Sequence, residues 1–324
     1  MSDFFRQAEP YRSELLVHCY RMLGSRDDAE DLVQETYLRA WRGYAGFEGR
    51  SSLRAWLYRI ATTACLSALQ HRSRRLLPSG LGRPDDDLDP SVPTEVLWLQ
   101  PFPGTHPDPS TQDPALIVGS RSSVRLALIA ALQHLPPRQR AVLILRDVLA
   151  WRATEVADLL GTTTIAVNSA LRRARAQLDA VAPDENDAGP PLDRAHQELL
   201  ERYVTAFENA DVDALIRLLH ADVTLEMPPE PTWFAGRDAV ARFVAARIFP
   251  RTGPLRLRTT YANDQPAVAA YRRDEKDEIF RPYALQVLTL RGAHVTGIVV
   301  FRQSISFSAF GLPEALDPIP VPLT

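Results

Sequence analysis

The sequence predicts a multidomain protein in which two all-α domains are followed by an α+β domain. Its 324 residues are more than one ordinary hydrophobic core organises. Two stretches rich in Pro, Gly and Asp interrupt the chain, and after Pro191 the hydrophobic pattern changes from helical spacing to a mixture of helical and alternating spacing. We therefore expect helical domains at 1–77 and 121–182, a linker at 78–120, an α+β domain at 192–312 and a tail at 313–324.

The composition fits a folded protein without a bound metal or disulfide. Apolar residues make up 45% of the chain and charged residues 24%. The two cysteines, Cys19 and Cys65, form no CxxC pair and have no histidine cluster nearby, so we expect no cofactor, no metal site and no disulfide framework. No stretch approaches the ~20 apolar residues of a membrane span, and residues 1–11 lack an apolar signal core, which predicts a cytoplasmic protein without membrane contact.

Local charge is more informative than the net charge of −3. The net charge is +3 over residues 1–77, −6 over 78–120, +5 over 121–182 and −5 over 183–324. Basic blocks suit contact with nucleic-acid phosphates, because each neutralised phosphate releases counterions. Ordinary solvated surface charge is the alternative explanation.

The first helical domain carries two patterned segments. In residues 27–42, Leu38 stands among polar side chains on the face opposite the apolar one. An apolar anchor with a polar rim is a common partner-binding layout, although an ordinary solvated face would show the same spacing. Residues 47–75 predict a Gly-containing loop and then a helix with Arg59 and Thr63 on its outward stripe. Trp56 lies at the edge of that stripe, where it is either buried or free to hold an unstacked base.

The linker is dense in Pro, Gly and Asp, which interrupt helices and central strands. Its segment 96–101, VLWLQP, is apolar and contains Trp98. We therefore expect part of the linker to dock on a protein surface.

The second helical domain contains the pattern of a helix-turn-helix at 151–178, preceded by a hinge at Leu135-Pro136-Pro137 and a scaffolding helix at 138–148. Gly161 permits the tight turn, and Thr163 or Thr164 can cap the second helix. At about 100° per residue, one face of that helix is apolar and the other carries hydroxyl and guanidinium groups. Such a face suits contacts to phosphates, base edges and thymine methyl groups in the major groove, whereas the alternative is a helical hairpin with a solvated arginine face.

The C-terminal segment predicts helices at 194–209 and 212–220 and strands at 223–227, 255–261, 267–272, 283–291 and 294–301. A curved sheet wrapped on helices fits this order and would enclose an apolar cavity. Five polar residues are candidates to point into the cavity: His220, Glu226, Tyr261, Tyr271 and Arg302. Their spacing fixes no acid–base pair, so we expect no catalytic residue and no enzyme activity.

Two segments together carry a family resemblance. The stretches LLVHCYRMLGSRDDAEDLVQETYLRAWR and FEGRSSLRAWLYRIATTACLSAL resemble region two of extracytoplasmic-function sigma factors, of the sigma-70 family, and the helix-turn-helix resembles their region four. The resemblance implies an alternative sigma factor that binds core RNA polymerase and directs promoter-specific initiation of transcription. A helix-turn-helix regulator that acts independently of core polymerase is the first alternative.

The resemblance also assigns roles to named residues. It implies that the clamp of the beta-prime subunit of core polymerase binds Asp31, Gln34, Glu35 and Leu38. It implies that the −10 element of promoter DNA is opened and read by Phe47, Ser51, Ser52, Trp56, Arg59, Thr63 and Gln70. It implies that the −35 element is read by Thr164, Ile165, Asn168, Ser169, Arg172, Arg173 and Arg175.

The recognition helix departs from the family pattern. Relatives commonly have Gly-Thr-Val-Lys-Ser-Arg where this chain has IAVNSA at 165–170. The loss of cations at Asn168 and Ala170 shifts the expected phosphate contacts to Arg172, Arg173 and Arg175. The promoter sequence is therefore not transferable from relatives.

The C-terminal segment resembles a SnoaL-like domain, which has the nuclear-transport-factor-like cone fold, as in a subgroup of these sigma factors. The resemblance lies in ERYVTAFENADVDALIRLLHADVTLEMPP, FAGRDAVARFV and FRPYALQVLTLRGAHVTGIVVF. We expect this acidic domain to regulate activity through intramolecular contacts with the linker and the sigma domains, and its cavity could take a small ligand. Because the fold also occurs in enzymes, an enzyme with a DNA-binding appendage is the second alternative.

Overall fold

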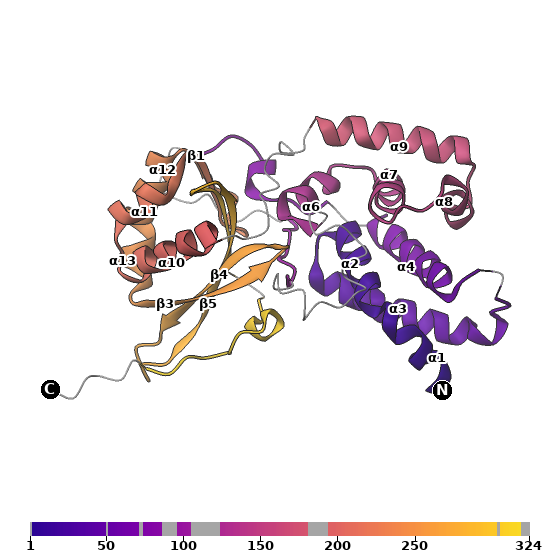
Figure 1. Ribbon diagram of the computed structural model, residues 1–324, viewed down its shortest axis with the longest axis horizontal. Helices are drawn as coiled ribbons and strands as arrows, with labels where there is room; N and C mark the ends of the chain where they lie inside the picture. The colour runs from indigo at the N-terminus through magenta and orange to yellow at the C-terminus, as the bar shows by residue number, and fades with distance from the viewer. Residues whose placement is uncertain are drawn as a thin grey trace. The chain divides into compact units, whose positions relative to one another are not determined.

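The computed structural model describes residues 2–49, 51–70, 74–85, 96–104, 124–180, 194–302 and 305–318. Its contacts divide the chain into a helical unit, residues 1–75 and 108–183, and a second unit, residues 76–107 and 184–324, which we call the sheet unit. Figure 1 shows the helices of the first unit in indigo to pink and the sheet of the second in orange. The predicted fold class, helical segments followed by an α+β domain, is confirmed.

The helical unit combines the two helical segments of the sequence. Its helices are α1 (Ser2–Ala8), α2 (Arg12–Leu23), α3 (Arg26–Gly43), α4 (Leu53–Leu69), α6 (Leu126–Gln133), α7 (Pro137–Leu143), α8 (Ala153–Leu160) and α9 (Thr164–Asp179). In the first segment α2, α3 and α4 pack on one another, and in the second α7 and α8 pack on α9. Ser25 and Ser52 cap α3 and α4 by accepting hydrogen bonds from backbone amides one turn on.

Contacts between α2, α6, α7 and α4 join the two segments into one unit. The Arg140 side chain of α7 is 2% exposed and donates to the carbonyl oxygen of Met22, in the last turn of α2. It also donates to the Gln133 side chain at 2.6 Å and to the carbonyl of Leu135 at 3.2 Å, where α6 has ended. Burial lowers the pKa of Arg140 to about 10, so the buried group remains a cation at neutral pH.

The core of the first segment buries polar groups as well as apolar ones. His18 is fully buried, and its Nε2 lies 2.9 Å from the Thr62 hydroxyl. Cys19 and Cys65 are free thiols, both buried, and the hydrogen bond between them raises the pKa of Cys65. Among the described residues no group of three or more His, Cys, Asp or Glu could hold a metal ion, and no helix is long and apolar enough to cross a membrane.

The sheet unit has one six-stranded sheet in the order β2-β1-β6-β5-β4-β3, with β1 and β6 parallel and all other neighbours antiparallel. Its elements are α10 (Arg194–Glu208), α11 (Val212–Leu218), β1 (Leu219–Glu226), β2 (Trp233–Ala235), α12 (Arg237–Phe243), α13 (Phe249–Thr252), β3 (Leu255–Ala262), β4 (Gln265–Arg273), β5 (Phe280–Arg291) and β6 (His294–Phe301).

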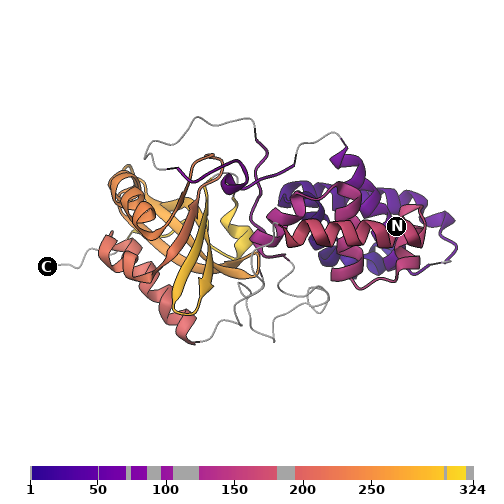
Figure 2. The same ribbon diagram turned by 90° about the horizontal axis from the view of Figure 1, so that it is seen from above.

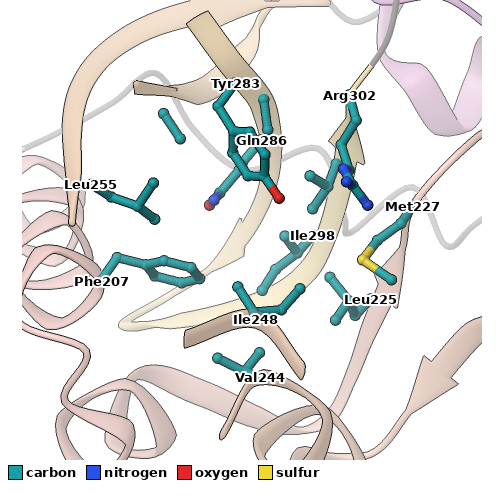
Figure 3. A pocket seen from close by; sticks show the side chains of 13 residues that line it. Phe207, Leu225, Met227, Val244, Ile248, Leu255, Tyr283, Gln286, Ile298 and Arg302 are labelled. Carbon is teal, nitrogen blue, oxygen red and sulfur yellow. The ribbon is translucent and has the colours of Figure 1, made fainter. Parts of the chain in front are cut away.

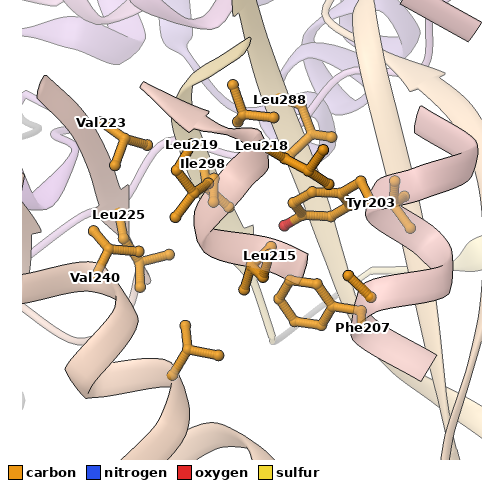
Figure 4. Packing of buried hydrophobic residues seen from close by; sticks show 14 of the residues in the cluster. Tyr203, Phe207, Leu215, Leu218, Leu219, Val223, Leu225, Val240, Leu288 and Ile298 are labelled. Carbon is orange, nitrogen blue, oxygen red and sulfur yellow. The ribbon is translucent and has the colours of Figure 1, made fainter. Parts of the chain in front are cut away.

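One face of this sheet packs on the helices. Residues of α10, α11 and α12 share a core with inward residues of the strands, among them Tyr203, Leu215, Val240 and Ile298 (Figure 4). Tyr203 is fully buried and donates its hydroxyl proton to the Gln286 side chain at 2.7 Å. Because the phenol is paired, its burial carries no unsatisfied polar group.

The other face of the sheet is covered in part by the 3-10 helix η9 (Phe307–Phe310) and the residues that follow it. Tyr271 packs edge-on against Phe307 and donates to the carbonyl of Pro313. Figure 2 shows the turn that contains Phe307, in yellow, on the side of the sheet away from the orange and salmon helices. Linker residues pack at the β3 edge of the sheet, where Phe102 and Asn263, in the turn between β3 and β4, exchange two hydrogen bonds at 2.8 and 2.9 Å.

Several element boundaries differ from the predictions. The helix predicted at 212–220 ends at Leu218, because Leu219 already pairs with Val295 of β6. The helix predicted at 138–148 changes after Leu143 to a wider π-helical turn over Ile144–Val148. Strand β2 and helices α12 and α13 were not predicted as elements; β2 has three residues, too few for an alternating pattern to show.

We predict that His18 makes the stability of the helical unit depend on pH. Burial lowers the pKa of His18 to about 3, below the ordinary 6.5, so below pH 6.5 the unfolded chain binds a proton that the folded chain does not. The free energy of unfolding should therefore fall by about 1.4 kcal/mol per pH unit as the pH drops from about 6.5 towards 3.

The measurement is urea unfolding between about pH 7 and pH 5 for the wild type, for His18→Gln and for the control His294→Gln, an exposed histidine. His18→Gln should show a shallower pH dependence than the wild type, and His294→Gln should not differ from it. Equal slopes in all three proteins would contradict the assignment.

Candidate nucleic-acid and partner-binding surfaces

The second helix of the helix-turn-helix, α9, begins as its sequence predicts. Gly161 adopts φ 60° and ends α8, a conformation that glycine takes without strain. Thr163, and not Thr164, caps α9: its side chain accepts a hydrogen bond from the Ala166 amide at 3.2 Å. The cap fixes the direction in which α9 leaves the turn.

The two faces of α9 are those predicted. Val167, Leu171 and Ala174 are buried, so they hold the helix on the unit. On the outer face Ile165 is 78% exposed, more than any other large hydrophobic side chain of the described residues. Of the remaining residues expected to read the −35 element, four are exposed: Asn168, Arg172, Arg173 and Arg175. The other two, Thr164 and Ser169, are half-buried.

The three arginines of α9 are not equivalent. Arg175 forms a two-pronged ion pair with Asp147, with N–O distances of 2.7 and 2.8 Å, which the sequence did not reveal. Arg172 and Arg173 make no hydrogen bond or ion pair with another residue of the described ranges. These two side chains are therefore the cations of α9 that can turn to a phosphate without first breaking an ion pair.

The outer face of α3 presents an apolar residue inside a polar rim. Leu38 is 46% exposed, Asp31 and Gln34 are exposed, and Glu35 is half-buried beside Arg39, to which it is bonded at 2.6 Å. Trp41, one turn beyond Leu38, is 43% exposed and extends the apolar anchor. Sequence reasoning missed Trp41, although its spacing of three from Leu38 places both on one side of the helix.

The loop before α4 holds an aromatic stack. Phe47 stacks on Trp56 with ring centres 4.9 Å apart, and Tyr44 stacks on Phe47 at 6.3 Å. Trp56, in the first turn of α4, is thus half-buried under the ring of Phe47 from the preceding loop. This is intermediate between the two predicted alternatives, a fully buried Trp56 and one free to hold an unstacked base. Ser51 is exposed, and the Ser52 side chain is engaged as the cap of α4.

The outward stripe of α4 faces the helix-turn-helix. Arg59, Thr63 and Gln70 are all exposed, but Arg59 donates to the carbonyl of Asp158 in α8 at 3.1 Å. Tyr58, one residue earlier, lies with its ring 5.4 Å from that of Trp151, just before α8. Helix α4, which carries residues expected to read the −10 element, therefore packs against α8, the first helix of the helix-turn-helix, within this unit.

The sheet unit contains a cavity whose lining differs from the prediction. Of the five polar residues proposed for it, only Arg302 lines it, and the other lining residues with polar side chains are Tyr283 and Gln286. Glu226 points away and accepts a hydrogen bond from the Ser79 amide of the linker at 2.8 Å, and Tyr271 lies on the opposite face of the sheet. His220 and Tyr261 do not line the cavity either, so the prediction was wrong for four of the five.

Comparison with known families divides the chain in the same order as the structure. Residues 8–75 match sigma-70 region 2, residues 125–178 match sigma-70 region 4, and residues 200–303 match a SnoaL-like domain. The first two matches contain every residue expected to contact polymerase or DNA.

The chain also resembles complete proteins. It is 51% identical over 318 residues to the ECF RNA polymerase sigma factor SigG of Mycobacterium tuberculosis H37Rv, an alignment that covers 97% of this chain and 85% of the relative. It is 31% identical over 253 residues to SigJ of the same organism, covering 76% of this chain and 73% of SigJ. The crystal structure of SigJ superposes with a TM-score of 0.62, at 24% identity, and covers 95% of this chain and 99% of that one, so the fold is shared.

Proposed function

Because the chain belongs to the extracytoplasmic-function RNA polymerase sigma factors, we propose that the outer face of α3 binds core RNA polymerase while α4 and α9 read the two elements of a promoter. The family binds core polymerase and promoter DNA. The proposal for this chain rests mainly on α9, where Ile165 and the unpaired Arg172 and Arg173 are exposed opposite a buried apolar face.

The α3 surface has the layout of a small protein interface. Leu38 and Trp41 supply apolar area, and Asp31, Gln34 and Glu35 supply a polar rim with two carboxylates. Apolar anchors contribute most of the free energy of binding, and rim charges determine which partner is accepted. The proposed partner surface on the clamp of the beta-prime subunit is therefore basic around an apolar recess.

We propose further that the packing of α4 against α8 is a closed form that must open on a promoter. Two promoter elements centred about 25 base pairs apart lie about 85 Å apart on straight duplex, at about 3.4 Å per pair. Helices joined by the hydrogen bond from Arg59 to Asp158 do not span such a distance. Core polymerase would separate the two helical segments when it binds them.

We propose that the sheet unit regulates this opening through the linker. Residues 76–85 and 96–104 lie between the helical segments in sequence but belong to the sheet unit. The Asp85 amide donates to the carbonyl of Trp233, and the Gly104 amide donates to the carbonyl of Tyr261. A linker held in this way limits how far the two segments can move apart.

The first prediction concerns α3. Replacing both Asp31 and Glu35 by Arg should weaken binding of core RNA polymerase by about tenfold or more, because rim carboxylates would become cations facing a basic partner. Affinity for purified core enzyme, measured by fluorescence anisotropy of the labelled full chain, reports the change.

The matched control replaces Glu198 and Glu201 of α10 by Arg. This control makes the same change in net charge as the α3 variant. Each variant also removes one i,i+4 ion pair, Glu198 with Arg194 in the control and Glu35 with Arg39 in α3. It should bind core enzyme as the wild type does. Equal affinity of the α3 variant and the wild type would eliminate the proposed surface.

The second prediction concerns α9. Arg172→Ala should weaken binding of the reconstituted holoenzyme to promoter fragments selected from genomic DNA, and should lower the slope of log affinity against log salt by about one. Arg175→Ala should have a smaller effect, because Arg175 is already paired with Asp147. The control is Arg194→Ala, an exposed arginine of the sheet unit. A full-sized effect of Arg175→Ala with none for Arg172→Ala would reverse the assignment.

The third prediction concerns the linker. Asn263 occupies a turn position with φ 54°, and its side chain accepts the Phe102 amide, so Asn263→Gly keeps the turn and removes one linker hydrogen bond. The loss should weaken the linker contact by about 1–3 kcal/mol, speed amide exchange at Phe102 and raise run-off transcription.

The control for this variant is Asn209→Gly, an exposed asparagine at the end of α10. Faster exchange at Phe102 with unchanged or reduced transcription would show that the linker contact does not restrain opening.

A further inference from the structure

The cavity of the sheet unit is apolar along most of its wall. Phe207, Leu225, Val244, Ile248 and Ile298 surround it, together with Met227. Figure 3 shows these side chains pointing into a common space from α10, β1, the turn after α12 and β6. The centres of water-sized spheres can occupy about 40 Å³ of it, which is room for roughly three waters or one small organic molecule and not for a long chain.

The polar groups of the wall are all hydrogen-bond donors or can act as donors. Tyr203 donates to the Oε1 atom of Gln286 at 2.7 Å, which fixes the orientation of the side-chain amide. The NH2 group of Gln286 remains as a hydrogen-bond donor. That NH2 group has no hydrogen bond to another residue of the described ranges, and Gln286 is only 5% exposed. The hydroxyl of Tyr283 and the guanidinium of Arg302 are the remaining polar groups of the wall.

The charge at the same wall is positive. The Arg302 guanidinium lies 5.5 Å from the ring centre of Tyr283, and Arg272 lies 4.9 Å from the same ring. Glu230 pairs with Arg302 at 3.2 Å. The lining itself includes no carboxylate and no histidine. A cationic ligand would meet Arg302, and a wholly apolar ligand would leave the amide donor unpaired.

We propose that this cavity binds a small carboxylate with a short apolar body. The apolar body lies among Phe207, Ile248 and Ile298, and the carboxylate accepts hydrogen bonds from Arg302 and from the NH2 group of Gln286. A guanidinium and a fixed amide are suitable partners for a carboxylate, because hydrogen bonds in which the donor or the acceptor is ionised are shorter and stronger than neutral ones.

A ligand in this place contacts the strand that holds the linker. Leu225 of β1 and Met227, the residue after the strand, line the cavity, and Glu226 between them faces the other way and accepts a hydrogen bond from the Ser79 amide. Successive side chains of a strand point to opposite faces. The cavity and the linker are therefore two sides of one strand.

The methionines provide a site-specific test. The chain has three, of which Met227 lines the cavity and Met22 is buried in the helical unit. The full chain with isotope-labelled methionine methyl groups is titrated with hexanoate, and in parallel with hexanamide, a neutral molecule of the same length. Hexanoate should shift the Met227 resonance saturably and leave Met22 unchanged, and it should bind about tenfold more tightly than hexanamide.

Two arginine variants separate the carboxylate site from general charge. Arg302→Gln should weaken hexanoate about tenfold and leave hexanamide unchanged, whereas Arg272→Gln, which removes a cation from the same ring but not from the cavity wall, should bind both as the wild type does. A Met227 resonance that keeps its wild-type position without ligand confirms that the sheet unit of each variant is folded, and an unchanged Met22 resonance does the same for the helical unit. The proposal is overturned if Met227 does not respond up to about 20 mM hexanoate, if hexanamide binds equally well, or if Arg302→Gln has no effect.

Discussion

The helical unit depends on one buried cation, the guanidinium of Arg140. Its hydrogen bonds reach the end of α2 at Met22, the end of α6 at Gln133 and the carbonyl of Leu135 in the hinge before α7. Buried carbonyl groups at helix ends need donors, and a cation there also interacts favourably with the helix dipole. One side chain thereby ties together the ends of helices from both sequence segments.

This contact explains why two DNA-reading helices from distant parts of the sequence share one unit. With Arg140 in place α7 lies against α2, α8 is carried to α4, and Arg59 meets Asp158. The hydrogen-bond partners of this buried charge are neutral carbonyls and an amide, and losing them inside the protein would cost much free energy. If the helices part, water can replace these partners. The same residue can therefore hold the closed form and permit a cooperative opening, since its hydrogen bonds are lost together.

Sequence reasoning succeeded where a pattern is local. The turn at Gly161, a cap at Thr163 or Thr164 and the buried face of Val167 and Leu171 follow from residues within one helix-turn-helix, and the structure selects Thr163. It failed where the partner is distant in sequence, as for Arg175 with Asp147. It also failed where the prediction depended on which side chains of a strand point to the core. At the end of β1 the core face belongs to Leu225 and to Met227, the residue after the strand, so the intervening Glu226 turns to the linker. A shift of one residue in a strand exchanges its two faces, and only the packing of the whole sheet decides between them.

The central claim is that the closed helical unit opens when the chain joins core polymerase on a promoter. The most direct test is the distance between spin labels at Ser67→Cys on α4 and Ala176→Cys on α9, both exposed positions, in a chain whose own cysteines are buried. The account predicts a short, narrow distance distribution for the free protein and an increase of about 40 Å or more in the transcribing complex. An unchanged distance in a complex that initiates transcription would contradict it.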